Sequence, residues 1–398
     1  NGDITDSGNL TVANNTTFDA SGKNIILNQN HDFNRVAIIS GNDVTLNDTN
    51  AIDLGNSTIT GSFTVTADGD ITQDSDNIIV ANNTTRLNAN GNDIILDNDN
   101  DFNTVEINNS NNVTLNEINN IDIGTSTTTG DLDVTANSTL STSAIVDVGG
   151  DTKLTATEIN FLGGSNTVTG NGTIQLQPKS TSQEIAIAGA EGTPALDISQ
   201  SDISALDGFN PTQAIIIGRD NGSNPVQIVG DVTFDDAVKI QSPEGSIAVD
   251  GNITGTGNAS IELNSSDTTI NADITTEGQT ITIGNNPNST EDNIEISADI
   301  VAISTGGDQA GNIFFNGNIN GKTESEQTLQ VSPGTGEVFF NGQVGNIRSL
   351  ESLIIGDALT GNADLVGSST TVFNSLFVNA EQTRVAGEIK TTGGPIQF

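Results

Sequence analysis

The stretch Val44-Thr45-Leu46-Asn47 returns, residue for residue, as Val113-Thr114-Leu115-Asn116. In both places apolar and polar side chains alternate, which is the pattern of a β-strand with one buried face. The match extends outward from these words. It has an offset of 67 to 69 residues and holds from about residue 3 to residue 137. We therefore interpret this part of the chain as an internal duplication.

A shorter period lies inside each copy of the repeat. Apolar pairs with one residue between them recur in steps of 19, and a second set of apolar residues keeps the same step. The remaining steps, from Leu10 to Ile25 and from Ile78 to Ile94, are 15 and 16 residues long. These steps predict about four coils in each repeat. The residues predicted to form the core are the pairs Ile25 and Leu27, Val44 and Leu46, Phe63 and Val65, Ile94 and Leu96, Val113 and Leu115, and Leu132 and Val134, and the second set Phe33, Ile52, Ile71, Phe102, Ile121 and Leu140.

Strands this short cannot each bury a face alone, but parallel stacking of coil on coil buries every inward side chain. The sequence therefore predicts an all-β parallel β-helix, or β-solenoid, with about 19 residues per coil and roughly 20 coils. Residues 1–140 form the regular part. We expect residues 141–398 to continue as a less regular β-helix with loop insertions near residues 177–225, where four of the eight prolines lie.

Composition excludes several classes of protein. The chain has 51 Asp and Glu against 11 Lys and Arg, giving a formal charge of -40. Nucleic acid and anionic membranes bind basic surfaces, so neither is expected as a partner. With no Cys, disulfides and thiol chemistry are excluded. No apolar run is long enough to insert into a membrane. The absence of Met indicates a processed protein or a piece of a longer one.

Two motifs bear on possible metal or acid–base chemistry. His31 is the only histidine, and Asn100 replaces it in the second copy, so we expect a solvent-exposed turn residue there. The alternation of Asp97, Asp99 and Asp101 resembles the start of a calcium loop, because alternating carboxylates can converge on a hard cation. Later positions lack the Gly and Glu of such loops. This is therefore a weak Ca²⁺ candidate, and otherwise no cofactor is expected.

A carbohydrate-active β-helix enzyme, a polysaccharide lyase or hydrolase, is the alternative. Such enzymes use paired carboxylates at a set separation or a base beside calcium. Acids such as Asp53 with Asp122, and Asp235 with Asp236, are available. The basic residues are scattered, and neither Trp nor Tyr is present to form a sugar platform. The two Phe-Phe pairs, at residues 314–315 and 339–340, are interpreted as core stacking with one ring of each pair facing outward.

Three stretches carry a resemblance to a known family. They are the cycle from GDIT through LTVANNTTF to NDVTLNDTNAIDLGNSTITG, the segment IAIAGAEGTPALDIS, and the stretch SLFVNAEQTRVAGEIKTTGG. Together they resemble the repeat region of filamentous-haemagglutinin-like large exoproteins, which are adhesins secreted by a two-partner route. The resemblance implies a right-handed helix and a location outside the cell or on its surface, in a Gram-negative bacterium. It also implies an outer-membrane secretion transporter as a partner.

The predicted function is therefore a non-enzymatic structural or adhesive solenoid, a segment or subunit of a surface filament or large secreted adhesin that serves adhesion or a biofilm matrix. The expected partners are further copies of the chain, in head-to-tail or lateral assembly, and ligands on host or neighbouring cells. Neither end of the sequence carries an obvious polar cap.

Overall fold

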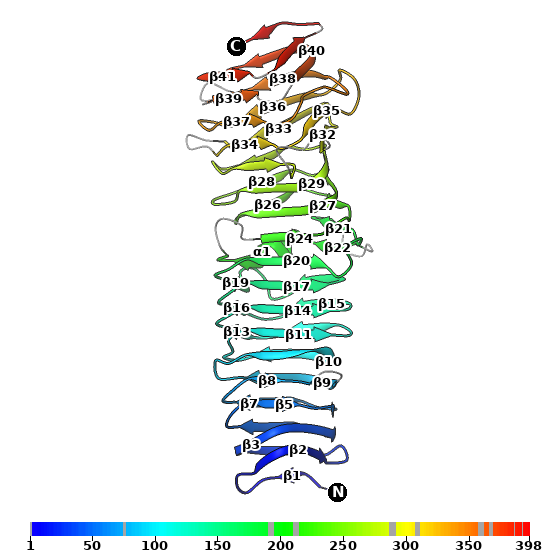
Figure 1. The fold of residues 1–398 in the computed structure, drawn as a ribbon, viewed down its shortest axis with the longest axis vertical. Coiled ribbons are helices and arrows are strands. Elements are labelled where there is room, and N and C mark those ends of the chain that lie inside the picture. The colour runs from blue at the N-terminus through cyan, green and yellow to red at the C-terminus, as the bar shows by residue number, and fades with distance from the viewer. Residues whose placement is uncertain are drawn as a thin grey trace. The chain divides into compact units, whose positions relative to one another are not determined.

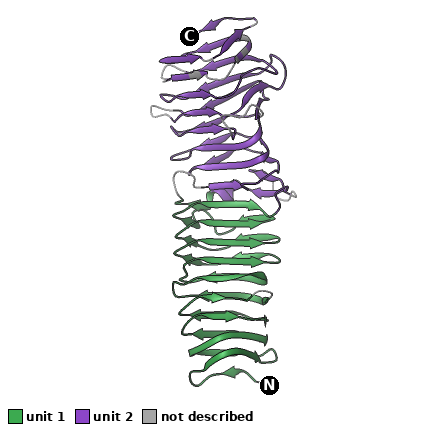
Figure 2. Ribbon diagram, viewed as in Figure 1, with its two compact units in different colours: residues 1–179, 204–209 green, residues 180–203, 210–398 purple. Residues whose placement is uncertain are grey.

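The structure is a computed structural model that describes residues 2–74, 77–189, 195–209, 215–285, 292–306, 311–356, 362–365, 369–385, 387–391 and 393–398. The fold is an all-β, right-handed parallel β-solenoid of about 17 turns with about 21 residues per turn. The predicted fold class is thus confirmed, and the turns are slightly longer and fewer than predicted. The chain divides into unit 1, residues 1–179 and 204–209, and unit 2, residues 180–203 and 210–398 (Figure 2).

Most strands of unit 1 are short, although β3 and β10 are 16 and 14 residues long, and the strands succeed one another along the stack (Figure 1). They are β1 (Ile4–Thr5), β2 (Thr11–Asp19), β3 (Ile25–Ser40), β4 (Val44–Asp48), β5 (Ile52–Leu54), β6 (Ser57–Ile59), β7 (Phe63–Ala67), β8 (Ile71–Thr72), β9 (Ile79–Asn88), β10 (Ile94–Ile107), β11 (Val113–Glu117), β12 (Ile121–Ile123), β13 (Ser126–Thr128), β14 (Leu132–Ala136), β15 (Thr139–Thr142), β16 (Val146–Val148), β17 (Thr152–Ala156), β18 (Glu158–Phe161), β19 (Val168–Gly170), β20 (Ile174–Pro178) and β23 (Leu206–Asp207).

The strands of unit 2 follow the same parallel scheme, and one short helix, α1 (Gln200–Ser204), precedes β23. They are β21 (Ile185–Ile187), β22 (Leu196–Ile198), β24 (Ile215–Gly218), β25 (Val226–Ile228), β26 (Val232–Phe234), β27 (Val238–Val249), β28 (Ile253–Gly255), β29 (Ile261–Ile270), β30 (Ile274–Thr276), β31 (Ile281–Ile283), β32 (Asn293–Ile296), β33 (Ile300–Ser304), β34 (Ile313–Phe315), β35 (Asn318–Gly321), β36 (Thr328–Ser332), β37 (Val338–Phe340), β38 (Leu350–Ile355), β39 (Asn362–Leu365), β40 (Ser369–Val378), β41 (Gln382–Val385), β42 (Glu388–Thr391) and β43 (Ile396–Gln397).

Inward side chains in unit 1 stand in files along the stack, as the period of the sequence predicts. In the first copy of the repeat Leu27 pairs with Leu46, and Leu46 pairs with Val65, in parallel ladders. The alternation of Val, Ile and Thr suits a strand that is buried on one side, and Asn, Asp and Gly occupy the corners between strands. Each inward residue therefore packs against its equivalents in the turns before and after it.

The second copy of the repeat forms an equivalent file. Leu96 pairs with Leu115, and Leu115 pairs with Val134. All eighteen side chains predicted for the core are at most 1% exposed, so their predicted burial agrees with the structure. They are Ile25, Leu27, Phe33, Val44, Leu46, Ile52, Phe63, Val65, Ile71, Ile94, Leu96, Phe102, Val113, Leu115, Ile121, Leu132, Val134 and Leu140.

The two copies of the repeat occupy different faces of unit 1. The file that contains Ile25 passes through Val44 and Phe63 to Thr85, three turns later. Ile94, the counterpart of Ile25 in the second copy, stacks instead on Ile71, one face further along the turn. A repeat therefore spans three turns and one additional face, about three and one-third turns, and the predicted four coils per repeat is wrong. The 15- and 16-residue steps, counted as full coils, cover only two of the three faces.

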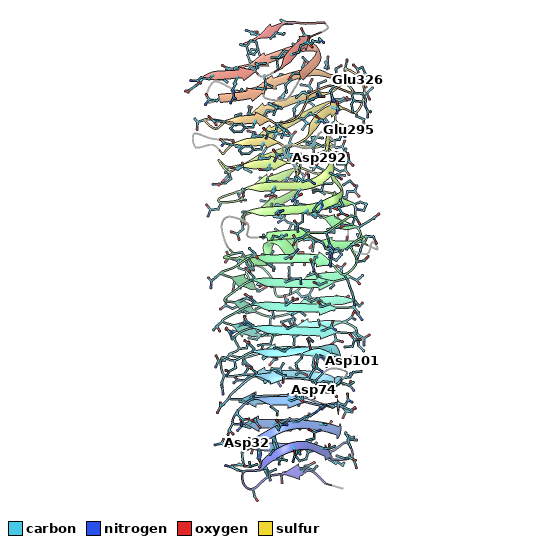
Figure 3. The ribbon with its side chains drawn as sticks, viewed as in Figure 1. Asp32, Asp74, Asp101, Asp292, Glu295 and Glu326 are labelled. Atoms are coloured by element: carbon cyan, nitrogen blue, oxygen red, sulfur yellow. The ribbon has the colours of Figure 1, made fainter. Side chains whose placement is uncertain are left out.

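The rotation of the second copy is visible on the outside as well. Asp32 and its counterpart Asp101 lie at opposite sides of the same view (Figure 3). Equivalent surface residues of successive repeats therefore point in different directions around unit 1.

Unit 2 has longer and less uniform turns. Its ladders include Val232 with Ile253 and Ile253 with Ile274, each 21 residues apart. By contrast, Ile281 pairs with Ile313 only after 32 residues, so this turn is longer. The two Phe-Phe pairs obey the predicted rule. The inner rings Phe315 and Phe340 are fully buried and stack at 4.9 Å, while the two outer rings stack at 4.7 Å.

Candidate functional site

Among the buried polar side chains of unit 1, one cluster of acid, amide or imidazole groups recurs at the equivalent place in each of the two repeats. The first cluster consists of Asp6, His31 and Asp48. Leu10 N–H donates to His31 Nδ1 at 3.0 Å, so His31 carries its proton on Nε2 and donates it to Asp6 Oδ2 at 2.7 Å. His31 is fully buried, and the prediction of an exposed turn residue is wrong. The carboxylate of Asp6 supplies the partner that makes this burial possible.

The second cluster consists of Gln73, Asn100 and Glu117 and reproduces the first with two neutral amides in place of the carboxylate and the imidazole. Gln73 and Asn100 exchange two hydrogen bonds, of 3.0 and 2.8 Å. Ile79 N–H donates to Asn100 Oδ1 at 3.0 Å, as Leu10 N–H does to the histidine of the first cluster. Leu10 N–H and Ile79 N–H are thus equivalent backbone donors that the two clusters satisfy. The accepting residues, His31 and Asn100, each follow a register shift in their strand.

The acids that complete the two clusters are equivalent residues of different length. Asp48 accepts from Phe33 N–H at 2.7 Å, and Glu117 accepts from Phe102 N–H at 2.7 Å. Burial raises the pKa of Asp48, and it raises the pKa of Glu117 to about 7. The pKa of Asp6 is lowered, first by the hydrogen bond from the backbone N–H of Gln29 and also by His31. None of the acids in these clusters is exposed to a ligand in solution, so we assign the clusters a structural role.

The three carboxylates of the weak calcium candidate are not gathered into one group. Asp97, Asp99 and Asp101 all lie on the outer side of β10. Asp99 accepts from Asn116 Nδ2 at 3.0 Å, and Asp101 accepts from Asn119 Nδ2 at 3.2 Å. In the described ranges, no three or more His, Cys, Asp or Glu side chains come together as a group that could hold a metal ion.

The acids considered for an enzyme are engaged in local contacts. Asp53 pairs with Arg35 at 3.3 Å, and burial, with the charge of Asp74 nearby, raises its pKa. Asp122 accepts from Ser143 Oγ at 2.7 Å, and Asp235 accepts from a threonine hydroxyl one turn away.

Several basic residues lie directly beside an acid in the neighbouring turn. These cross-strand pairs are Arg35 with Asp53, Arg86 with Glu106, Lys153 with Asp133 and Lys239 with Glu262. The few basic charges are therefore used to join turns, and the surplus of acid remains on the surface.

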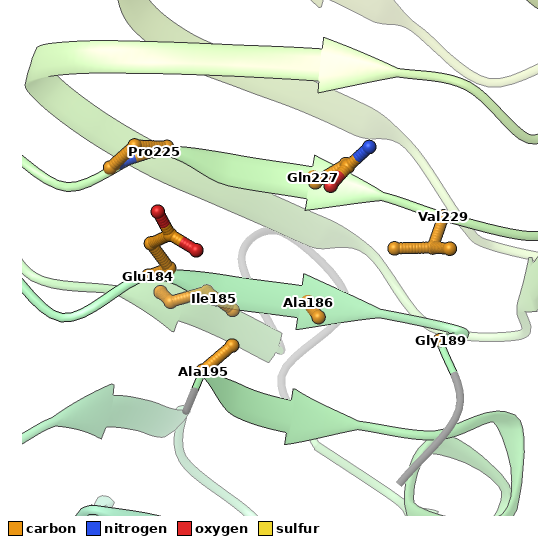
Figure 4. A pocket seen from close by; sticks show the side chains of 8 residues that line it. All are labelled: Glu184, Ile185, Ala186, Gly189, Ala195, Pro225, Gln227 and Val229. Carbon is orange, nitrogen blue, oxygen red and sulfur yellow. The ribbon is translucent and has the colours of Figure 1, made fainter. Parts of the chain in front are cut away.

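A hollow of about 350 Å³ on the outer side of unit 2 is a better candidate for ligand binding (Figure 4). It lies over β21, where Ile185 and Ile187 point to the core and Ala186 points outward. Register places Ala186 directly beside Gln227 of β25. The hollow arises because the outward side chain of Ala186 is smaller than its neighbour Gln227. The lining residues are Glu184, Ile185, Ala186, Gly189, Ala195, Pro225, Gln227 and Val229.

Sequence reasoning placed loop insertions in this region but did not find the hollow. The sequence feature that could have indicated the hollow is Ile185-Ala186-Ile187, a predicted strand with alanine at its outward position, between two proline-containing segments. The buried acids Asp48 and Glu117 were also missed, because a single Asp or Glu at a strand end reads as a surface residue. Residues 190–194 and 210–214, which belong to the expected insertions, lie outside the described residues.

No helical segment in the described part of the chain combines the length and apolarity needed to span a bilayer. Comparison with known families finds three matches to a family of repeats of unknown function (DUF5649), at residues 1–40, 41–108 and 110–176. The matches cover less than half of the chain, and their spacing agrees with the duplication. The third match continues the repeat beyond residue 137, where sequence reasoning ended it. No curated protein and no solved structure matches the chain.

Proposed function

We propose that the chain is a non-enzymatic, extracellular β-solenoid that acts as a structural and adhesive element of a surface filament or large secreted adhesin. The observation that carries the proposal is the way each turn is joined to the next by side chains as well as backbone. Such joints suit a scaffold that must hold its register under load.

A ladder of Asx side chains provides these joints at one corner of unit 1. Asp93 Oδ1 accepts from Asn112 N–H, and Asn112 Oδ1 from Asp131 N–H, each at 3.0 Å. Asp131 Oδ1 accepts from Asp151 N–H at 2.8 Å. Each bond satisfies a corner donor that a strand leaves unpaired. The ladder thus gives a structural reason for the abundance of Asn and Asp.

The same device recurs in unit 2. Asp231 Oδ1 accepts from Asn252 N–H at 2.9 Å, and Asn252 Oδ1 from Asp273 N–H at 3.0 Å. In each unit the polar and charged side chains that face solvent stand at the outward positions of stacked strands. A surface of this kind favours binding through repeated weak contacts over chemistry at one deep site.

Charge and resemblance complete the proposal. A net charge of -40 keeps copies soluble and apart, so assembly would depend on specific contacts, assisted by divalent cations that bind weakly to carboxylates. The proposed partners are further copies of the chain, cell-surface ligands and an outer-membrane secretion transporter. The proposed location is the exterior of a Gram-negative cell.

Two measurements on the purified chain test this proposal. Electron microscopy should show filaments that lengthen with concentration, and beads coated with the protein should adhere to cells or to biofilm more than beads coated with an equally acidic control protein. Failure of both would contradict the proposal. Release of reducing ends or unsaturated products from acidic polysaccharides would replace it with the enzyme alternative.

A further inference from the structure

We propose that the hollow over Ala186 binds a lysine or arginine side chain of a partner polypeptide, with Glu184 as the ion-pair acceptor. This inference rests on the adhesive function proposed above, because it names the chemistry of one partner. It concerns a single site within unit 2 and does not require filament assembly.

The two polar side chains of the lining, Glu184 and Gln227, each present an oxygen that can accept a hydrogen bond. Glu184 is exposed and is the one charged residue of the lining. None of the ion pairs within the described ranges uses it. Gln227 Nε2 donates to Asp250 Oδ2 at 2.7 Å, one turn away. This bond turns the Gln227 amide so that its carbonyl oxygen faces the strand that carries Ala186 (Figure 4).

A ligand for this site must therefore supply donors and no negative charge. Lysine and arginine side chains have donors only and a permanent positive charge. Phosphate, sulfate and carboxylate ligands are disfavoured by the Glu184 carboxylate. The surrounding negative field of the chain also raises the local concentration of a cation.

The apolar lining suits the stem of the same side chain. Ala186 and Ala195 are small and buried. Pro225, directly before β25, and Val229, directly after it, are exposed. In Figure 4 Glu184 lies at one end of the hollow, Val229 at the other, and Ala186 between them. A methylene stem can lie on this apolar lining while its charged head reaches the carboxylate. At about 350 Å³ the hollow is at the lower limit for ligand sites, which suits one long side chain.

The test uses fluorescence anisotropy of the full chain with two labelled peptides of equal length, one of Gly, Ser and Lys and one with Gln in place of Lys. Ala186→Leu places a bulky side chain in the middle of the hollow without changing any charge, and Glu184→Gln removes the negative charge. The matched controls are Ala248→Leu, at the outward position next to Gln227 in the following turn, and Glu244→Gln, an exposed acid elsewhere in unit 2. Circular dichroism verifies the fold of each variant.

We expect Ala186→Leu and Glu184→Gln each to weaken binding of the Lys peptide by about tenfold or more, as the loss of a charged hydrogen bond implies. The two controls should change it less than about twofold. If Ala186→Leu binds the Lys peptide as tightly as wild type, the peptide is held by the overall negative charge of the chain and not in the hollow, and the proposal is refuted. Equal binding of the Gln peptide would show that the ligand is neutral, and no binding of either peptide at low salt would also refute it. None of these outcomes depends on cell adhesion or filaments, so they are separable from a failure of the proposed function.

Discussion

Replacing Glu117 with glutamine should remove a pH dependence from the stability of unit 1. The Glu117 carboxyl is fully buried, and burial raises its pKa from 4.5 to about 7. In the unfolded chain the group loses its proton near pH 4.5, while in the folded chain it keeps the proton until about pH 7. The folded state therefore binds more protons across this interval, and its stability falls as pH rises from about 4.5 to 7.

The expected loss follows from the size of the shift. One pKa unit corresponds to about 1.4 kcal/mol, so a shift of roughly 2.5 units lowers the stability by about 3 kcal/mol between pH 4.5 and pH 8. Glu117→Gln cannot ionise and should show none of this decline. Its amide keeps only one of the two backbone bonds that the carboxyl accepts, from Phe102 and Asn119, which makes the variant less stable than wild type by about 1–3 kcal/mol at pH 4.5. The decline of the wild type offsets this difference as the pH rises, so at pH 8 the variant should be at least as stable as wild type.

Hydrogen exchange followed by mass spectrometry provides the assay, because it reports the free energy of opening for peptides that cover β10 and β11. Exchange is corrected for its intrinsic pH dependence. Asp99→Asn, an exposed change on β10, controls for the loss of one negative charge. A difference between wild type and Glu117→Gln that stays constant from pH 4.5 to pH 8 would refute the buried, raised-pKa carboxyl.

The remaining predictions concern the first polar cluster and the core. The double change Asp6→Gln with His31→Asn, which gives the first cluster the amide pair of the second, should preserve the stability of unit 1 to within about 1 kcal/mol in urea unfolding. His31→Leu alone should lower it by more, because it leaves the partly buried Leu10 N–H without its acceptor and removes the Nε2–H that donates to Asp6; equal stability of the two variants would be evidence against the hydrogen-bond assignment. Phe63→Ala removes a fully buried ring and should lower the stability by about 3–5 kcal/mol. Ile39→Ala, at a side chain that is 59% exposed, should change it by less than about 0.5 kcal/mol; similar losses for these two variants would contradict the assigned burial.

The fold class could be predicted because its signal is local and repeated. Apolar pairs such as Ile25 with Leu27 and Ile94 with Leu96 are bounded by turn-forming residues. Both the strands and the spacing between them can therefore be recognised from the sequence. The inward direction of the pairs then follows from the two-residue period of a strand.

The phase of the repeat could not be predicted in the same way. An offset of 69 residues shows that Ile25 and Ile94 have the same local structure, but it does not fix the number of faces between them. That number depends on the length of each corner, and corner residues tolerate insertions. The contacts of His31 were hidden for a related reason, since its partner Asp6 is 25 residues away and lies beside it only after the turn closes.

The central claim, that turns stack in register, is tested most directly by distances between spin labels on one outward file of unit 1. The file runs through Thr72, Ile95, Thr114, Asp133, Lys153 and Gln175, each paired with the next. Because the chain has no native Cys, pairs of introduced cysteines are labelled uniquely. Stacking predicts a narrow distribution near 19 Å, or about four strand spacings, for Thr72→Cys with Lys153→Cys. It predicts about 5 Å more for Thr72→Cys with Gln175→Cys, although 22 residues separate the two second sites. Broad distributions beyond about 60 Å, as an unstacked chain of this length would give, would contradict the account.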